Sequence, residues 1–161
     1  MPRPRPKPHR LLIVLPSWVG DAVMATPALR RIRAALPGAF VGALARPGID
    51  QLLAGSGLFD EVHVERASGV LGPKFVAAKV RPRRYDTALL LTNSFSTALI
   101  ARVAGIPRRI GYNRDARRLL LTDPLPPDRT PRGGFAIVPA VNAYWKLASS
   151  ICNDAPAPPL P

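Results

Sequence analysis

The sequence has one cysteine, Cys152, among its 161 residues, so the chain cannot form an intrachain disulfide. A single thiol fits a reducing compartment, and we expect the protein to be cytoplasmic. The apolar run near the start, residues 11–15, is short, ends at Pro16 and is followed by no small-residue cleavage site, so a signal peptide is not predicted. No later stretch approaches the ~20 apolar residues that a membrane-spanning helix needs.

The motifs of common nucleotide sites are also missing. Neither a Gly-x-Gly-x-x-Gly pattern nor a Gly-Lys-Ser pattern follows the first apolar run, so dinucleotide binding and phosphate cradling are not supported. His9 and His63 stand in no pattern of partners that indicates a metal site. We therefore expect neither a cofactor nor a metal.

Acidic residues are scarce, since 10 Asp and Glu stand against 23 Lys and Arg, which gives a net charge of +13. Such a surface favours anionic partners: nucleic acid, acidic lipid headgroups or phosphorylated sugars. The bases are not confined to a tail, because residues 74–84 hold five bases and no acid, and residues 102–118 hold six bases and only Asp115. An arginine-rich genome would explain the same composition, so charge alone does not identify the partner.

The 20 prolines cluster at the two ends. Residues 1–10 (MPRPRPKPHR) hold four prolines and four bases, and the last eight residues (DAPAPPLP) hold four prolines. Both are typical of extended tails. We expect a basic tail over residues 1–10, one folded domain over residues 11–151, and a proline-rich tail over residues 152–161.

Between the tails, strand-like and helix-like segments alternate. Residues 11–15 form a continuous apolar run, typical of a strand buried on both faces of a parallel sheet. Pro27 inside the following helical segment predicts either one kinked helix or a second helix that Pro27 starts with Thr26 as its cap, and we favour the kinked helix. The later predicted strands cover residues 40–45, 61–65, 85–91 and 109–112. The later helices cover residues 49–54, 75–80, 94–104 and 141–151, and residues 121–139 are predicted to be loop.

This alternation predicts an α/β fold with a Rossmann-like, doubly wound parallel sheet and right-handed crossovers. Ligands of such sheets bind beyond the carboxyl ends of the strands. That rule indicates two loops, residues 16–21 and residues 92–96.

The first of these loops carries the segment PSWVGDAVMATPALRRIR, in which Gly20 permits a tight turn or close approach to a ligand. Asp21 falls near the start of the helix. Its ordinary role would be to accept backbone N–H bonds there, which would contribute about 1 kcal/mol.

Three blocks of sequence, in order, resemble glycosyltransferase family nine, the ADP-heptose:lipopolysaccharide heptosyltransferases. They are LLIVLPSWVGDAVMATPALRRIRAALPGA, RYDTALLLTNSFSTALIARVAGIPRRIGYNRDARRLLLTD and the weaker VPAVNAYWKLA. The run Pro-Ser-Trp-Val-Gly-Asp looks most like the heptosyltransferase II branch. The resemblance implies a GT-B enzyme, in which two Rossmann-like halves face each other across a cleft.

The resemblance implies that this chain is the N-terminal, acceptor-side half and that the C-terminal donor-binding domain is absent. The family transfers L-glycero-D-manno-heptose from ADP-heptose with inversion, and Asp21 matches its catalytic aspartate. We therefore expect Asp21 to be the base that takes a proton from the acceptor hydroxyl. Without the donor-binding half, we expect the chain to be inactive alone.

Further substrate contacts are expected from Ser17, Trp18 and Gly20, which would shape the wall around the acceptor sugar. Trp18 is equally well explained by core packing. Asn93 and Ser94 could bind acceptor hydroxyls, although turning the chain and capping the next helix would explain them equally well.

The resemblance also implies basic contacts with the acceptor's anionic sugars and phosphates, and the candidates are Arg66, Lys74 and Lys79. The alternative for each is an ordinary solvated charge. The expected partner is a lipopolysaccharide core precursor, a Kdo- or heptose-bearing lipid A. We also expect peripheral contact with the anionic inner membrane.

Two other hypotheses remain at this stage. The chain could be a non-catalytic module that binds anionic glycolipid, or a basic protein that binds nucleic acid. No recognised nucleic-acid motif accompanies the charge, so no nucleic-acid partner is expected.

Overall fold

The computed structural model describes residues 6–65, 69–114, 117–134 and 138–152. Its strands are β1 (Arg10–Val14), β2 (Phe40–Ala45), β3 (Glu61–Val64), β4 (Thr87–Leu90), β5 (Arg108–Tyr112) and β6 (Asp123–Leu125). Its α-helices are α1 (Val19–Ala35), α2 (Ile49–Leu52), α3 (Gly72–Val80), α4 (Phe95–Val103) and α5 (Ala140–Cys152). Two short 3₁₀ turns are η1 (Arg81–Arg83) and η2 (Arg118–Leu120).

The six strands form one sheet in the order β3-β2-β1-β4-β5-β6, and every neighbouring pair is parallel. The chain moves outward from β1 in one direction to β3, then returns to β4 beside β1 and moves outward in the other direction. The predicted doubly wound parallel sheet is therefore confirmed. This order places the carboxyl ends of β1 and β4 next to each other, where the winding direction reverses.

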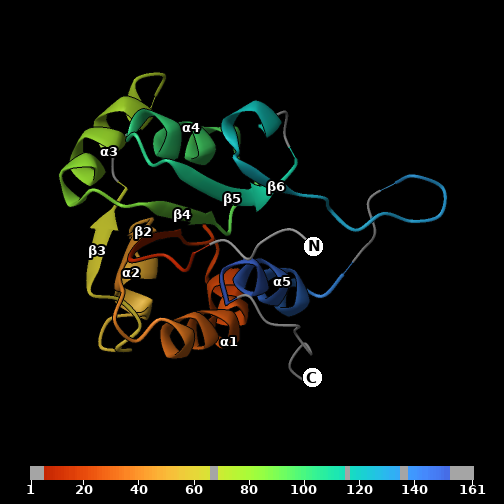
Figure 1. The fold of residues 1–161 in the computed structure, drawn as a ribbon, viewed down its shortest axis with the longest axis horizontal. Coiled ribbons are helices and arrows are strands. Elements are labelled where there is room, and N and C mark those ends of the chain that lie inside the picture. The colour runs from red at the N-terminus through yellow and green to blue at the C-terminus, as the bar shows by residue number, and fades with distance from the viewer. Residues whose placement is uncertain (1–5, 66–68, 115–116, 135–137, 153–161) are drawn as a thin grey trace.

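Helices cover both faces of the sheet (Figure 1): α3 and α4 lie over one face, and α1, α2 and α5 lie over the other. Residues of β1 alternate between the two cores. Leu11 and Ile13 pack in the core under α1 and α5, whereas Leu12 and Val14 pack in the core under α3 and α4. The apolar run that predicted a strand buried on both faces is thus explained directly.

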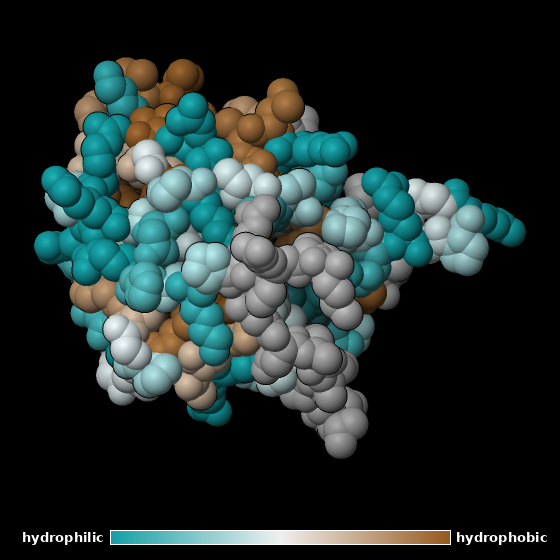
Figure 2. Space-filling model, viewed as in Figure 1, coloured by the Kyte–Doolittle hydropathy of each residue, from teal (hydrophilic) through white to brown (hydrophobic). Residues whose placement is uncertain are grey.

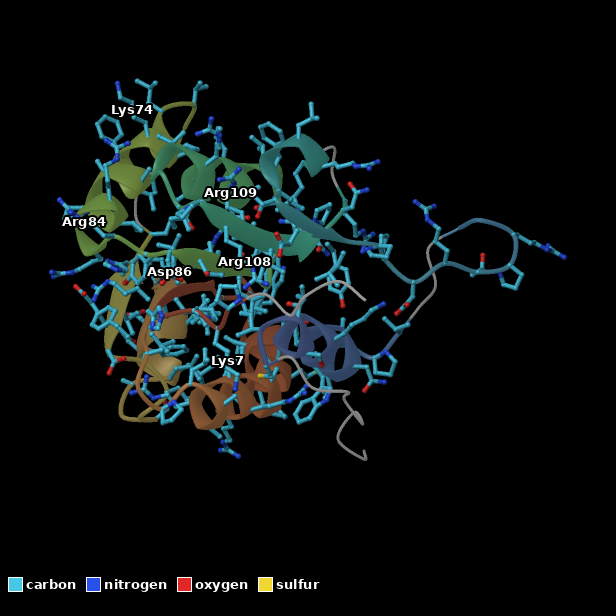
Figure 3. The ribbon with its side chains drawn as sticks, viewed as in Figure 1. Lys7, Lys74, Arg84, Asp86, Arg108 and Arg109 are labelled. Atoms are coloured by element: carbon cyan, nitrogen blue, oxygen red, sulfur yellow. The ribbon has the colours of Figure 1, made fainter. Side chains whose placement is uncertain are left out.

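Asp86 joins three strands at the amino edge of the sheet, opposite the edge where α1 and α4 begin. Its carboxylate accepts the backbone N–H groups of His9 (3.0 Å) and Arg10 (2.9 Å) and the hydroxyl of Thr87 (2.8 Å). Its own carbonyl accepts the N–H of Arg108 at the start of β5 (3.2 Å). Figure 3 shows Asp86 and Arg108 in this part of the sheet. The side chain and the backbone carbonyl of Asp86 together therefore align the starts of β1, β4 and β5.

The first helix is continuous from Val19 to Ala35 with Pro27 inside it, so the favoured single helix is confirmed and the second helix is not formed. A proline has no N–H, which leaves the carbonyl of Val23, four residues earlier, without its helical donor. The Thr26 hydroxyl donates to that carbonyl at 2.7 Å. The neighbouring threonine thus replaces the hydrogen bond that Pro27 removes.

The structure corrects the prediction that residues 121–139 are loop throughout. Asp123–Leu125 forms β6, parallel to β5, even though Pro124 lies within it. The strand is at the sheet edge, where a missing N–H is tolerated. Arg108 holds its first residue through an ion pair, Nε to the Asp123 carboxylate at 3.0 Å.

Both predicted tail boundaries shift. Arg10 lies in β1, and the backbone of His9 is bound to Asp86, so the folded part begins before residue 11. At the other end, α5 extends to Cys152, whose side chain is buried. Residues 1–5 and 153–161 lie outside the described part of the chain.

A phenol crosses the sheet at its amino half. Tyr85, just before β4, reaches over β1 to Gly42 of β2, and its hydroxyl forms a hydrogen bond with Nε2 of His63 on β3 at 2.8 Å. A β-carbon at residue 42 would overlap the phenol ring. Glycine is required there because another side chain approaches, not because of its backbone conformation.

We predict that Gly42→Ala lowers the free energy of unfolding by about 1–3 kcal/mol, since the phenol must leave its place or the strand must shift. Gly38→Ala is the matched control, because a β-carbon at residue 38 meets no atom within 4 Å. Urea denaturation of both variants measures the difference. Equal stability of the two variants would contradict the packing described for Tyr85.

Burial lowers the pKa of His63 below its ordinary value of 6.5, opposed by the nearby Glu61 carboxylate and assisted by Arg83. The unfolded chain therefore binds a proton that the folded protein does not bind as the pH falls through 6.5. We predict that the free energy of unfolding decreases over this range, by up to about 1.4 kcal/mol per pH unit for one proton.

This loss ends once the pH falls below the folded-state pKa of His63. Urea denaturation at pH values of about 7.5 and 5.5 measures it, and His63→Gln should remove this part of the pH dependence. His9→Gln is the control that should retain it. If His63→Gln and the parent chain lose the same stability on acidification, another group is responsible.

Candidate functional site

A cavity of about 300 Å³ opens at the carboxyl edge of the sheet, beyond the ends of β1, β2, β3 and β4. Residues at or just after the ends of β1, β2, β3 and β4 all line it: Val14, Leu44, Glu65 and Leu91. The polar and aromatic lining comprises Ser17, Trp18, Asp21, Arg46, Thr92, Asn93, Ser94, Ser96, Thr97 and Tyr144. Both loops that the strand-end rule indicated, residues 16–21 and 92–96, meet in this cavity.

Asp21 lies in the first turn of α1, whose N-cap residue is Trp18, and its side chain is half-buried. The start of α1 has no side-chain capping hydrogen bond. Within the described residues the Asp21 carboxylate makes neither a hydrogen bond nor an ion pair, so the helix-cap role considered from the sequence is not found. A short carboxylate on a rigid helix turn is therefore available to a ligand in the cavity.

The loop before α1 supplies the rim of the cavity. The side chain of Trp18 is 75% exposed, which excludes the alternative that it packs in the core. Ser17 is half-buried and lines the cavity beside it. Gly20 is exposed within the helix and does not line the cavity, and a β-carbon there would meet no atom within 4 Å.

In the second loop, residues 92–96, Ser94 stabilises the start of a helix and Asn93 can contact a ligand. Ser94 is the N-cap of α4, because its hydroxyl accepts the N–H of Thr97 at 3.3 Å. The capping role considered for Ser94 is thus confirmed, and the hydroxyl still lines the cavity. Asn93 is half-buried, and among the described residues its amide has no hydrogen-bond partner. Asn93 is therefore the better candidate for contacting a ligand.

The buried side chain of Arg117 forms hydrogen bonds that fix the 92–96 loop. Arg117 is 0% exposed, and its guanidinium donates from Nε to the carbonyl of Tyr112 (2.9 Å) and from one Nη to the carbonyl of Ser94 (3.3 Å). A β-carbon at Gly111 would lie 2.8 Å from its other Nη. Gly111 in β5 thus leaves room for the guanidinium of Arg117, which holds the 92–96 loop through the carbonyl of Ser94.

The structure adds residues that the sequence analysis did not select. Arg46 and Glu65 follow β2 and β3 directly, so the strand-end rule applied to all four strands would have found them. Thr92 was inside the predicted loop, and its hydroxyl forms a hydrogen bond with that of Thr97 at 2.6 Å. Tyr144 comes from α5, and no local sequence signal indicates that α5 reaches the cavity.

Tyr144 lies close to Asp21. Burial, reinforced by the negative charge of Asp21, raises the pKa of the Tyr144 phenol to about 12. The phenol therefore keeps its proton near neutral pH and can donate a hydrogen bond toward the cavity.

A second cavity of about 270 Å³ adjoins the first and shares Leu91, Asn93 and Tyr144 with it. It is bounded by Arg114 and Asp128, among others. Its wall includes Tyr112, whose hydroxyl donates to the carbonyl of Ala143 at 2.7 Å. The second cavity thus extends the site on the side of β5 and α5.

The structure does not bring the predicted basic contacts into this site. Lys74 and Lys79 are exposed on α3 and line neither cavity. Figure 3 shows Lys74 at the outer side of the α3 layer. Arg66 lies outside the described residues. Their role as acceptor contacts stays a prediction.

Comparison with known proteins identifies the family. The profile of glycosyltransferase family 9 (heptosyltransferase) matches residues 75–159, which is more than half of the chain. The chain belongs to glycosyltransferase family 9. The resemblance inferred from the three sequence blocks is thus confirmed.

Curated members of family 9 align with most of the chain. Lipopolysaccharide heptosyltransferase 2 of Escherichia coli strain K12 is 33% identical over 118 residues, covering 71% of this chain and 34% of the relative. Lipooligosaccharide heptosyltransferase 2 of Haemophilus ducreyi is 31% identical over 120 residues, with the same coverage. The chain therefore spans about a third of the length of these relatives.

Solved structures agree with the fold. The E. coli ADP-heptose lipopolysaccharide heptosyltransferase II superposes with a TM-score of 0.69 at 29% identity, covering 86% of this chain and 40% of that one. The family 9 glycosyltransferase of Veillonella parvula superposes with a TM-score of 0.73 at 18% identity, covering 89% and 41%. The second likeness concerns the fold alone.

No three His, Cys, Asp or Glu side chains come together as a metal site within the described residues. None of the helices that the structure describes has the length and apolarity to cross a bilayer.

We predict that Ser94→Ala lowers the free energy of unfolding by about 1 kcal/mol, because α4 loses its N-cap. Ser96→Ala, at the exposed second residue of α4, should change it by less than about 0.5 kcal/mol. Thermal denaturation of the two variants measures this. A loss of equal size in both would show that Ser94 does not stabilise α4 as a cap.

Proposed function

We propose that this chain is the acceptor-side domain of an inverting heptosyltransferase that adds L-glycero-D-manno-heptose from ADP-heptose to the lipopolysaccharide inner core. The observation that carries the proposal is the unpartnered carboxylate of Asp21 in a cavity lined by hydroxyl, amide and aromatic side chains. Sugars are bound by such a combination of hydrogen-bonding groups and an aromatic surface. Membership of family 9 and likeness to heptosyltransferase 2 proteins support the same activity.

In the proposed reaction, the acceptor hydroxyl lies against Asp21, which takes its proton as the oxygen attacks the anomeric carbon of the heptose. The bond between that carbon and the ADP oxygen breaks, and ADP leaves with the bonding electrons. Tyr144 holds its own proton and can orient the carboxylate or the acceptor by donating a hydrogen bond. Trp18 offers its ring to an apolar face of the sugar at the cavity rim.

Arg46 is the basic residue best placed to meet the acceptor's negative charge. It is exposed, lines the cavity and follows β2 on the same edge as Asp21. Anionic sugars carry carboxylates and phosphates, which arginine binds with paired N–H groups. Arg46 thus joins Lys74 and Lys79 as a proposed contact, with the difference that it already lies in the cavity.

The donor is expected to bind mainly to a second domain that faces this edge of the sheet. On this proposal the 161-residue chain binds acceptor but transfers no heptose alone. Incubation of the purified chain with ADP-heptose and a lipid A core acceptor tests this. Heptose transfer by the chain alone would show that it holds a donor site of its own.

The base role is tested by joining this chain to the remaining part of E. coli lipopolysaccharide heptosyltransferase 2. In that fusion we predict that Asp21→Asn lowers kcat by about 10²–10⁴-fold, because the amide cannot accept the proton. The dissociation constant of the acceptor should change little, since the proton moves only in the transition state.

Asp50→Asn is the matched control, because Asp50 is an acid on the same side of the sheet whose carboxylate accepts the backbone N–H of Gly48 and does not line the cavity. It should keep kcat within about twofold. An active fusion in which Asp21→Asn retains full kcat would contradict the base role.

A further inference from the structure

The start of α3 carries exposed apolar side chains that the fold does not use. Val70, Leu71 and Phe75 are 97%, 61% and 58% exposed, and Lys74 and Lys79 are exposed beside them. We call these five residues the α3 patch. Figure 2 shows apolar and hydrophilic side chains interleaved over this layer, and Figure 3 shows Lys74 at its outer side.

The patch is separate from the face of α3 that packs on the sheet. Val76, Ala77 and Val80 are buried in the core shared with α4, so the helix already has its apolar contacts. Leu71 and Phe75 are one helical turn apart on the opposite side, where the N–H of Phe75 donates to the carbonyl of Leu71 at 3.3 Å. Exposed apolar side chains grouped with bases are typical of surfaces that bind a partner.

Bases outnumber acids around the patch. Residues 61–114 hold ten bases and three acids, Glu61, Glu65 and Asp86. Glu61 forms an ion pair with Arg83, and the Asp86 carboxylate accepts the backbone N–H groups of His9 and Arg10 at the amino edge of the sheet. The layer formed by α3 and α4 therefore presents a positive surface with no acid on either helix.

We propose that the α3 patch docks on the surface of an anionic phospholipid bilayer. Val70, Leu71 and Phe75 would enter the boundary between headgroups and acyl chains, while Lys74 and Lys79 meet the lipid phosphates. Charge complementarity selects an anionic surface. The apolar side chains favour a bilayer over nucleic acid, since a phosphate backbone gives Val70 and Leu71 no apolar region to enter.

The position of the patch fits the proposed function. Helix α3 starts on the carboxyl edge of the sheet, the edge that holds Asp21, and Glu65 at the end of the preceding strand lines the cavity. Docking would therefore hold the mouth of the cavity near the membrane. This step rests on the proposed function, because only a lipid-linked acceptor gains from that proximity.

Co-sedimentation with vesicles tests the docking itself, with neither acceptor nor donor present. We expect the 161-residue chain to bind vesicles of phosphatidylglycerol and phosphatidylethanolamine, and to bind neutral phosphatidylcholine vesicles at least tenfold more weakly. Phe75→Ser should weaken binding to the anionic vesicles about tenfold, because it removes an inserted ring. Lys74→Glu should weaken it by roughly tenfold to thirtyfold, because it reverses a charge near the surface.

Matched controls lie on the other face of the sheet. Leu52→Ser removes an exposed apolar side chain from α2, and Arg30→Glu reverses an exposed charge on α1. Both should keep vesicle affinity within about twofold. Circular dichroism of all four variants checks that each remains folded.

Three results would overturn the proposal. The first is equal weakening by Lys74→Glu and Arg30→Glu, which would mean that net charge alone drives binding. The second is full retention of affinity by Phe75→Ser. The third is absence of vesicle binding together with salt-sensitive binding to duplex DNA, which would assign the surface to nucleic acid. Because heptose transfer is not measured, failure here leaves the Asp21 experiment unaffected, and the reverse also holds.

Discussion

The central position of β1, with β2 on one side and β4 on the other, is the constraint on which the rest of the structure depends. Both of its faces are buried from Leu11 to Val14, so this part of the strand must be apolar, and the strand order shows that the winding of the chain reverses beside it. That reversal leaves a gap at the carboxyl edge that no crossover helix covers. The cavity with Asp21 and Asn93 lies there, whereas at the amino edge the Asp86 carboxylate accepts hydrogen bonds from the starts of β1 and β4.

Some polar side chains of the cavity hold the protein's own backbone in place, whereas their neighbours have no hydrogen-bond partner among the described residues. Ser94 is committed to capping α4, and Arg117 is committed to carbonyls beneath the loop. Asn93 and Asp21 have no such commitment within the described residues. The backbone around the cavity is thus held in place by the protein's own hydrogen bonds. The side chains of Asp21 and Asn93 can then form their hydrogen bonds with a ligand.

The sequence predicted those parts of the structure that depend on local patterns. The strand over residues 11–15 follows from its apolar run, and the place of Asp21 follows from the strand-end rule. β6 was missed because Pro124 argues against a strand, and because the strand pairs with β5 and forms an ion pair with Arg108, which lies in a separate segment of the chain. Tyr144 was missed for a similar reason, since it reaches the cavity only because α5 packs on α1. Such contacts between distant segments have no signature in a local window.

The phenol of Tyr85 has a consequence for the order of assembly. Tyr85 lies two residues before β4, yet its ring lies across Gly42 of β2 and its hydroxyl forms a hydrogen bond with His63 of β3, so it links the two halves of the sheet that wind outward from β1. Strands on one side cannot reach their final packing before the strand on the other side arrives. The sheet should therefore open and close as one cooperative unit, and neither half should persist as a partly folded intermediate.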